Sequence, residues 1–355
     1  MRAALYYDRS DVRVEEIPDP TPGPGDVVID IAACGICGSD LHEYTDGPSA
    51  IPTEPHPVTG ASAPTPFGHE FGGTVSAVGD EVASVSQGDT VAVNPLFYCD
   101  ECRYCVAGEY NRCIAPYGIG YSSGSGGFSE RIAVPEDRVV QMPDGLPAAY
   151  AALVEPFSVG LHAVKRGTVE AGATVAVFGA GPIGLAVIQA AHVAGARDIY
   201  AIEPQARRRQ IAPTVGATAV IDPTDLDAVD TITAASDGGV DIAFEVAGVE
   251  ETFRNASDVV KRGGVVTVVS LFMHAFEWNP QVIVSDELTI RGSRAYDNGP
   301  GGGVEFNTVP RMMAEGSLDP EPLISSRIGL EEITSAGFEA LLDDEGNEVK
   351  ILVTP

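Results

Sequence analysis

Four residues of metal-ligand type lie far apart in the sequence, upstream of a glycine-rich turn. They are Cys37, the adjacent pair His69 and Glu70, and Glu155. Thiolate, imidazole and carboxylate groups bind Zn²⁺, and a catalytic zinc keeps three protein ligands and one exchangeable position. Ligands drawn from separate segments are typical of such a site. A zinc ion held here could act as a Lewis acid on a substrate oxygen.

A hydroxyl group and an imidazole follow Cys37 closely, at Ser39 and His42. An alcohol held by the metal must lose its proton before it can give up a hydride. Ser39 at the metal and His42 nearer solvent therefore predict a relay that carries this proton outward. His42 on its own would be equally consistent with a surface histidine. Cys34 is interpreted as a small core residue.

The run Gly-Ala-Gly-Pro-Ile-Gly at 179–184 follows an apolar segment and opens a helical one. Gly179 permits a tight turn, Gly181 lets a pyrophosphate approach the backbone, and Gly184 allows close packing of helix on strand. Pro182 and Ile183 would begin the helix, whose N-terminus offers unpaired N–H groups to phosphate. The run predicts a dinucleotide site; a glycine-rich turn without a ligand is the alternative.

An acidic residue, Glu203, lies 19 positions after Gly184, where a second strand should end. A carboxylate there accepts hydrogen bonds from the adenosine ribose and repels a 2′-phosphate, which favours NAD. Arg207, Arg208 and Arg209 follow and leave NADP open. One of these arginines could stack on the adenine. A Lewis-acid site and a dinucleotide site in one chain have few uses other than hydride transfer.

A second candidate metal site is formed by four clustered cysteines: Cys99, Cys102, Cys105 and Cys113. Four thiolates close a tetrahedral shell around Zn²⁺, so the site should be structural. Free cysteines or an iron–sulfur cluster are alternatives. The spacing alone would also suit a nucleic-acid zinc ribbon, but acidic neighbours such as Asp100 and Glu101 make that electrostatically poor.

These residues need two kinds of scaffold. The first ~150 residues carry short alternating runs at 26–31, 73–78 and 89–93, which predict a mainly antiparallel, barrel-like β domain. The proline-rich stretch 47–66 is predicted to be an ordered surface loop, and the Ser/Gly run 121–127 a turn or flexible loop.

From about residue 173 the pattern alternates between strand and helix. An apolar strand at 174–178 precedes a helix at 182–194, and further strands are expected near 199–202, 219–221, 242–246 and 265–269. This alternation predicts a parallel sheet covered on both faces. It stops near 288–290, and the final strand, 349–353, is expected to return to the first domain.

Composition limits the classes of protein. A chain of 355 residues suits about two domains. No apolar run reaches the ~20 residues that a membrane span needs, and the N-terminus lacks the pattern of a signal peptide, so the cytoplasm is expected. The net charge of −30 disfavours nucleic acid as a partner and predicts a surface adapted to high salt.

The chain resembles the zinc-dependent medium-chain dehydrogenase/reductase family over essentially its whole length. The resemblance rests on Gly-His-Glu-Phe at 68–71, Leu-Val-Glu-Pro at 153–156, the glycine run ending at Gly184, and Val-Lys-Ile-Leu-Val at 349–353. Within the family, the proline-rich segment 51–60 makes it most similar to the 2,3-butanediol dehydrogenases.

This resemblance implies a GroES-like catalytic domain, 1–155 and 295–355, with a structural zinc lobe near 95–115. It implies a Rossmann NAD-binding domain over 156–294. Carried over, Cys37, His69 and Glu155 would bind a catalytic zinc, with Glu70 either a fourth ligand or a carboxylate beside the ligands. The four clustered cysteines would bind a second zinc, and Arg208 would lie by the adenosine.

The activity implied is hydride transfer between a secondary alcohol or vicinal diol and NAD, with 2,3-butanediol and acetoin as the substrate pair. Polyol, threonine and glucose dehydrogenases of the same family are alternatives, as is use of NADP. A non-catalytic nucleotide-binding protein is the alternative from another class. The family also implies a homo-oligomer, a dimer or a tetramer, in which 282–290 could pair edge strands between subunits.

Overall fold

The computed structural model describes residues 1–343 and 347–355, which form two compact units. The first unit comprises Met1–Glu155, Asp297–Gly316 and Ile324–Pro355, and the second comprises Pro156–Tyr296 and Ser317–Leu323. Each unit has its own core of buried apolar side chains. Each unit thus has an apolar core, although the chain as a whole is strongly acidic.

The first unit is built from β-sheets whose neighbouring strands run antiparallel, except for the last pair, β17 and β18. A seven-stranded sheet follows the order β10-β6-β5-β3-β18-β17, with β9 also paired to β3, and a three-stranded sheet has the order β2-β1-β4. The strands are β1 (Arg2–Asp8), β2 (Asp11–Glu16), β3 (Asp26–Gly35), β4 (Thr65–Pro66), β5 (Glu70–Val78), β6 (Thr90–Val93), β9 (Arg131–Pro135), β10 (Val139–Gln141), β17 (Ile324–Gly329) and β18 (Lys350–Thr354), together with a separate pair, β7 (Leu96–Phe97) and β8 (Tyr117–Gly118).

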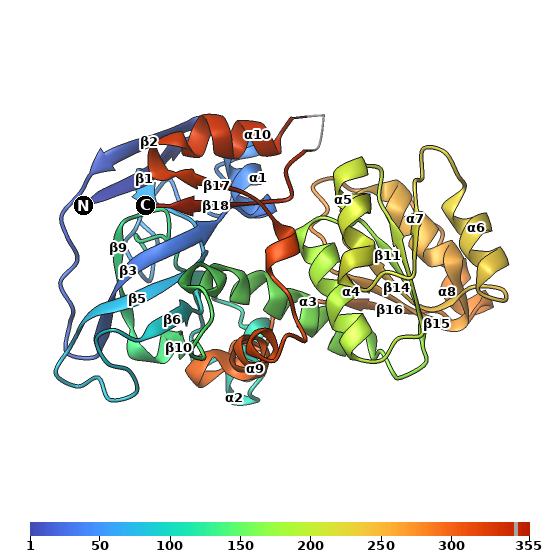
Figure 1. Ribbon diagram of the computed structural model, residues 1–355, viewed down its shortest axis with the longest axis horizontal. Coiled ribbons are helices and arrows are strands. Elements are labelled where there is room, and N and C mark those ends of the chain that lie inside the picture. The colour runs from blue at the N-terminus through green and yellow to red at the C-terminus, as the bar shows by residue number, and fades with distance from the viewer. Residues whose placement is uncertain (344–346) are drawn as a thin grey trace. The chain divides into compact units, whose positions relative to one another are not determined.

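The central strand of this unit, β3, explains why distant segments meet. It pairs with β5 over most of its length and with the last strand, β18, near its end, where Leu352 lies opposite Gly35. Figure 1 shows β18, coloured red, beside β3, coloured blue. The apolar residues of β18 are fully buried. The prediction that the final strand returns to the first domain is confirmed.

Short helices connect these strands. The α-helices of the first unit are α1 (Gly38–Asp46), α2 (Arg103–Val106), α9 (Gly303–Ala314) and α10 (Glu339–Leu341), and α3 (Val154–Gly167) begins there. The start of α1 is stabilised by Asp40, whose carboxylate accepts a hydrogen bond of 2.9 Å from the backbone N–H of Cys37. This contact fixes Cys37 immediately after β3.

The second unit is a six-stranded parallel sheet in the order β13-β12-β11-β14-β15-β16. Every residue of β11 is buried, as expected for a strand with both faces of its sheet covered. This order reverses between β11 and β14, where dinucleotides bind in sheets of this type. The strands are β11 (Thr174–Phe178), β12 (Asp198–Ile202), β13 (Ala219–Ile221), β14 (Val240–Glu245), β15 (Val260–Val268) and β16 (Thr289–Gly292), and the helices are α4 (Pro182–Val193), α5 (Ala206–Ile211), α6 (Ala228–Ala235), α7 (Glu250–Val259) and α8 (Gln281–Ser285) (Figure 1).

The predicted alternation of strands and helices is confirmed, with shifts at the strand boundaries. The helix α6 begins at Ala228, where the side chain of Asp227 accepts a hydrogen bond of 2.8 Å from the N–H of Asp230. An aspartate in this position satisfies one of the unpaired N–H groups at a helix start. Within the described part of the chain, no helix is long and apolar enough to cross a membrane.

The acidic composition leads to a testable prediction about salt. With 51 acidic against 21 basic residues, self-repulsion should destabilise the folded chain when few cations are present to screen it. We expect the thermal midpoint of unfolding to be several degrees higher in molar NaCl or KCl than in dilute buffer. Circular dichroism melts at constant pH would measure this, and equal midpoints would refute the high-salt interpretation.

Candidate active site

Three of the predicted metal ligands are brought together by the pairing of β3 with β5. Cys37 lies at the start of α1, directly after β3, while His69 and Glu70 lie at the start of β5. Glu70 is opposite Gly35 in the sheet, and a Cβ on Gly35 would lie 2.3 Å from a Glu70 oxygen, so only glycine leaves room there. Ligand atoms of Cys37, His69 and Glu70 all lie within 4.8 Å of one another.

Glu155 contributes a fourth buried group from the first turn of α3. Its oxygens lie outside the 4.8 Å group formed by the other three residues. Burial raises the pKa of Glu155 to about 7, the nearby charge of His69 lowers it, and that of Glu70 raises it further. A buried carboxylate whose negative charge is poorly compensated by neighbouring positive groups is suited to binding a cation.

Glu70 is engaged by a residue that the sequence interpretation did not single out, Lys350. The Lys350 ammonium lies 2.6 and 2.9 Å from the two oxygens of Glu70 and donates a further hydrogen bond of 2.9 Å to the carbonyl oxygen of Ile36. Both side chains are almost completely buried. Burial alone would lower the pKa of Lys350, but the charge of Glu70 raises it above its usual value. The chain has only three lysines, and one within the apolar run at 349–353 was the available signal.

Asp40 is a second residue whose role becomes visible only in the structure. One of its oxygens holds the N–H of Cys37, and the other lies 3.3 Å from Nδ1 of His69. Burial alone would lower the pKa of His69, but the charges of Asp40 and Cys37 raise it well above its usual value. A carboxylate beside one ring nitrogen orients the other nitrogen of a metal-binding histidine. Nε2 of His69 therefore faces the remaining groups of the site.

Tyr121 is the third residue that sequence reasoning missed. Its hydroxyl lies 2.9 Å from the hydroxyl of Ser39 and 2.9 Å from Nε2 of His69, and its ring stacks on the His69 ring at 4.6 Å. Burial and the charges of Cys37 and Asp40 raise the pKa of Tyr121 well above its usual value, so its O–H stays protonated. The run 121–127 forms turns and bends, in agreement with the prediction of a turn or flexible loop, and its first residue, Tyr121, packs beside His69.

Of the two predicted relay residues, Ser39 alone makes a direct contact within this cluster. His42 is half-buried and lies one helical turn after Ser39 on α1. Within residues 1–343 and 347–355, no direct hydrogen bond joins the two side chains. A relay through both residues would therefore need a bridging water. Cys34 is fully buried, as expected of a core residue.

The donor set of this site suits Zn²⁺. A thiolate, an imidazole and carboxylates are the usual ligands of catalytic zinc. The buried carboxylate of Glu155 and the position of Asp40 beside His69 fit a site that would hold a divalent cation. In contrast, both oxygens of Glu70 are already engaged by Lys350.

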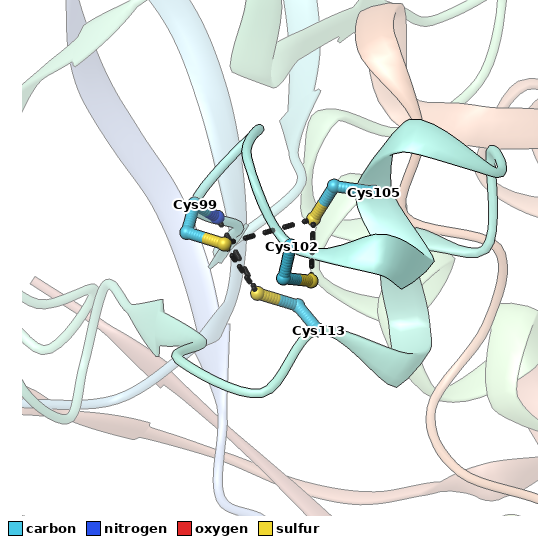
Figure 2. A group of neighbouring side chains, drawn as sticks. All are labelled: Cys99, Cys102, Cys105 and Cys113. Atoms are coloured by element: carbon cyan, nitrogen blue, oxygen red, sulfur yellow. Dashed lines mark hydrogen bonds between the residues drawn. The ribbon is translucent and has the colours of Figure 1, made fainter.

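The second cysteine cluster also has the chemistry of a zinc site. Figure 2 shows Cys99, Cys102, Cys105 and Cys113 with their sulfur atoms pointing toward one another. All four sulfurs lie within 4.8 Å of one another, with separations of 3.5 Å for the pairs Cys102–Cys105 and Cys99–Cys113. Backbone N–H groups, that of Cys105 first, lower the pKa of Cys102 to about 6, which favours the thiolate. The arrangement suits a closed, structural tetrahedral site.

Loss of one of these thiolates should remove one zinc and weaken the lobe. We expect Cys102→Ser to contain one zinc fewer per chain, to unfold several degrees lower, and to be cut more readily by protease between residues 99 and 113. Elemental analysis and limited proteolysis would check this. Cys34→Ala, at a buried cysteine outside both clusters, is the matched control and should keep its full zinc content.

The glycine-rich turn has the geometry that close packing requires. Gly179 has φ +100°, and a Cβ on Gly184 would lie 1.9 Å from the Gly179 carbonyl oxygen, so neither position tolerates a side chain. The helix α4 begins at Pro182, directly after Gly181, and Ile183 lies in its first turn. The exposed N–H groups at this helix start can receive a phosphate.

Glu203 lies at the end of β12 and reaches back to this turn. One of its oxygens accepts a hydrogen bond of 2.7 Å from the N–H of Ala180, and the other one of 2.9 Å from Gln205. The Arg208 guanidinium lies near Gly181, and its buried Nε has no hydrogen-bond partner among the described residues. Arg209 is occupied by an ion pair of 2.6 Å with Asp222. Arg208 is thus the arginine whose guanidinium lies beside the turn.

Comparison with known proteins assigns the chain to a class. Residues 23–144 match the family model of the alcohol dehydrogenase GroES-like domain, and residues 182–315 match that of the zinc-binding dehydrogenases. The chain belongs to the zinc-dependent alcohol dehydrogenase family, in which a GroES-like domain is joined to a Rossmann domain. The predicted family and fold class are confirmed.

Particular relatives are similar over the whole chain. The (R,R)-butanediol dehydrogenase of Bacillus subtilis is 41% identical over 357 residues, covering 100% of both chains. That of Neisseria gonorrhoeae is 37% identical, covering 100% of this chain and 99% of the relative. The crystal structure of 2R,3R-butanediol dehydrogenase from Bacillus subtilis superposes with a TM-score of 0.92 at 40% identity, covering 100% of this chain and 99% of that one.

Proposed function

We propose that this zinc-dependent dehydrogenase oxidises a vicinal diol with NAD, with 2,3-butanediol as substrate and acetoin as product, and catalyses the reverse reduction. The observation that carries the proposal is the full-length similarity, at 41% identity, to an (R,R)-butanediol dehydrogenase. Every residue type needed for this chemistry is present in the site described above.

In this proposal Cys37, His69 and Glu155 hold the catalytic zinc, and Glu70 lies beside them, neutralised by Lys350. A zinc ion held there would lower the pKa of the substrate alcohol, and bound NAD would take up the hydride. Ser39 accepts the proton of the alcohol through its hydroxyl and passes it, by way of a water, to His42. Asp40 keeps the His69 ring oriented throughout.

The coenzyme proposed is NAD, because Glu203 offers carboxylate oxygens at the end of β12. A ribose with free 2′- and 3′-hydroxyls can donate hydrogen bonds to this carboxylate, whereas a 2′-phosphate would be repelled by it. Arg208, beside Gly181, would contact the adenosine or the pyrophosphate. The unpartnered Nε of Arg208, beside the turn, is the observation that keeps NADP as the second candidate.

Removal of the Glu203 carboxylate should weaken the discrimination between NAD and NADP. We expect Glu203→Ala to raise the KM for NAD about tenfold, as loss of one or two charged hydrogen bonds implies, and to lower the ratio of NAD to NADP efficiency. Steady-state kinetics with both coenzymes would measure the change. Glu250→Ala, at an exposed carboxylate outside the turn, should leave both KM values unchanged.

A substrate panel tests the proposed activity directly. The three 2,3-butanediol isomers, sorbitol, threonine and glucose should each be assayed with NAD and NADP at high salt. The proposal expects the largest kcat/KM for a 2,3-butanediol isomer with NAD. A larger kcat/KM for sorbitol, threonine or glucose would contradict the proposed substrate. A lower KM for NADP than for NAD would contradict the proposed coenzyme.

The assembly proposed is a homo-oligomer, a dimer or a tetramer. The strand β16 lies at one end of the parallel sheet, and its outer edge pairs with no strand of the described residues. Edge strands of this kind pair readily with a second copy. Light scattering at high salt would establish the subunit number.

The clustered free cysteines favour a reducing compartment such as the cytoplasm.

A further inference from the structure

The proposed chemistry leaves one polar group of the site without a task, the hydroxyl of Tyr121. It lies 2.9 Å from Ser39 Oγ, the group proposed to take the substrate proton, and 2.9 Å from Nε2 of His69, a proposed metal ligand. A tyrosine hydroxyl both donates and accepts a hydrogen bond. Its position beside two groups that must meet the substrate makes it a candidate for substrate recognition.

The loop that carries Tyr121 is held in place from two sides. On one side, Gly127 donates a hydrogen bond of 2.7 Å to the carbonyl oxygen of Gly68, immediately before His69. On the other side, the hydroxyl of Thr59, in the proline-rich segment, donates to the carbonyl oxygen of Ser122. The Tyr121 ring itself stacks on His69. A hydroxyl held by so many contacts has little conformational freedom to lose when it binds a ligand.

Metal binding at His69 would change the hydrogen bonding of the Tyr121 hydroxyl. Nδ1 of His69 lies 3.3 Å from an Asp40 oxygen, and Nε2 lies 2.9 Å from the Tyr121 hydroxyl. In the tautomer that carries its hydrogen on Nδ1, Nε2 accepts a hydrogen bond from the Tyr121 hydroxyl. If His69 served as a metal ligand through Nε2, that nitrogen would no longer accept a hydrogen bond, and the Tyr121 hydroxyl could donate to Ser39 Oγ or to a substrate oxygen. Leaving this O–H group unpaired in an occupied site would be unfavourable.

We propose that Tyr121 is a substrate-binding residue whose hydroxyl donates a hydrogen bond to the second oxygen of a vicinal diol. This inference rests on the proposed function. The reacting hydroxyl of the diol meets Ser39, and the oxygen on the adjacent carbon meets Tyr121, whose own oxygen lies 2.9 Å from that of Ser39. A secondary alcohol with a single hydroxyl, such as 2-butanol, leaves the Tyr121 donor unpaired and should be discriminated against.

Comparison of a diol with a monohydric alcohol in a Tyr121→Phe variant tests this role. We expect kcat/KM for 2,3-butanediol to fall about tenfold, the equivalent of one hydrogen bond, while kcat/KM for 2-butanol changes less than about threefold. The phenylalanine keeps the stacked ring, so zinc content and thermal midpoint should match the wild type. Tyr117→Phe is the control, because this nearby tyrosine lies in β8, with its ring stacked on that of Phe97 at 4.8 Å, and its loss of a hydroxyl should affect neither alcohol.

A binding measurement separates recognition from catalysis. In the complex of enzyme with NADH neither alcohol can be oxidised, so the quenching of NADH fluorescence reports equilibrium binding alone. The dissociation constant of the diol should rise about tenfold in Tyr121→Phe, and that of 2-butanol should not. Equal losses for both alcohols, or no loss for either, would overturn the role of Tyr121. A wild-type enzyme that oxidises no vicinal diol would instead overturn the proposed function.

Discussion

Cys37→Ser and His69→Ala should each reduce kcat/KM by about three orders of magnitude or more while leaving the fold intact. The Lewis-acid contribution to alcohol oxidation is worth several kcal/mol, and each 1.36 kcal/mol changes the rate tenfold. Both residues lie just beyond the ends of strands β3 and β5 and outside the apolar core of the first unit. Steady-state kinetics, zinc analysis and far-ultraviolet circular dichroism would measure the three effects.

The control for the first prediction is Cys34→Ala, which removes a thiol only three residues from Cys37. Cys34 is fully buried, so the change should cost about 1 kcal/mol of stability and leave turnover nearly unchanged. Full activity in Cys37→Ser or His69→Ala would rule out the proposed site. Wild-type protein stripped by a chelator, intact by circular dichroism and still fully active, would rule it out independently.

Lys350→Met should have the largest effect on stability of any single substitution considered. It leaves the Glu70 carboxylate fully buried and without its partner, and breaking a buried ion pair in this way costs about 3–5 kcal/mol. We therefore expect the free energy of unfolding, measured by denaturant titration at high salt, to fall by that amount. Activity should fall as well, because Glu70 directly follows the ligand His69 in β5.

Two further variants make this prediction specific. Lys165→Met, at an exposed lysine near the end of α3, should change stability by no more than about 0.5 kcal/mol. The double variant Glu70→Gln with Lys350→Met removes both charges and should recover at least half of the loss, because the two sites are strongly coupled. A loss below about 1 kcal/mol in Lys350→Met alone would contradict the assignment of a buried ion pair.

The order of strands and helices in the second unit was predictable from the sequence, because several local signals agree. The apolar run at 174–178, the glycines at 179, 181 and 184 and the acidic residue at 203 predicted strand, turn, helix and strand end in the right order. The reason is that a parallel sheet of this type repeats one strand–turn–helix segment, and each segment can be predicted from its own periodicity and turn residues. The strand pairing of the first unit was harder to predict, because its sheet joins β3 to a strand more than 300 residues later in sequence.

The amino-acid sequence by itself determined the class of this protein: metal-ligand types at separated positions, a cysteine cluster and a dinucleotide turn are recognisable without coordinates. Tertiary structure alone decided which other side chains serve the site. Lys350 meets Glu70, Asp40 meets His69, and Tyr121 meets Ser39 because β18, α1 and the 121–127 loop converge on the start of β5. Partnerships between residues up to 280 positions apart leave no local pattern, since they depend on strand register and burial and not on spacing along the chain.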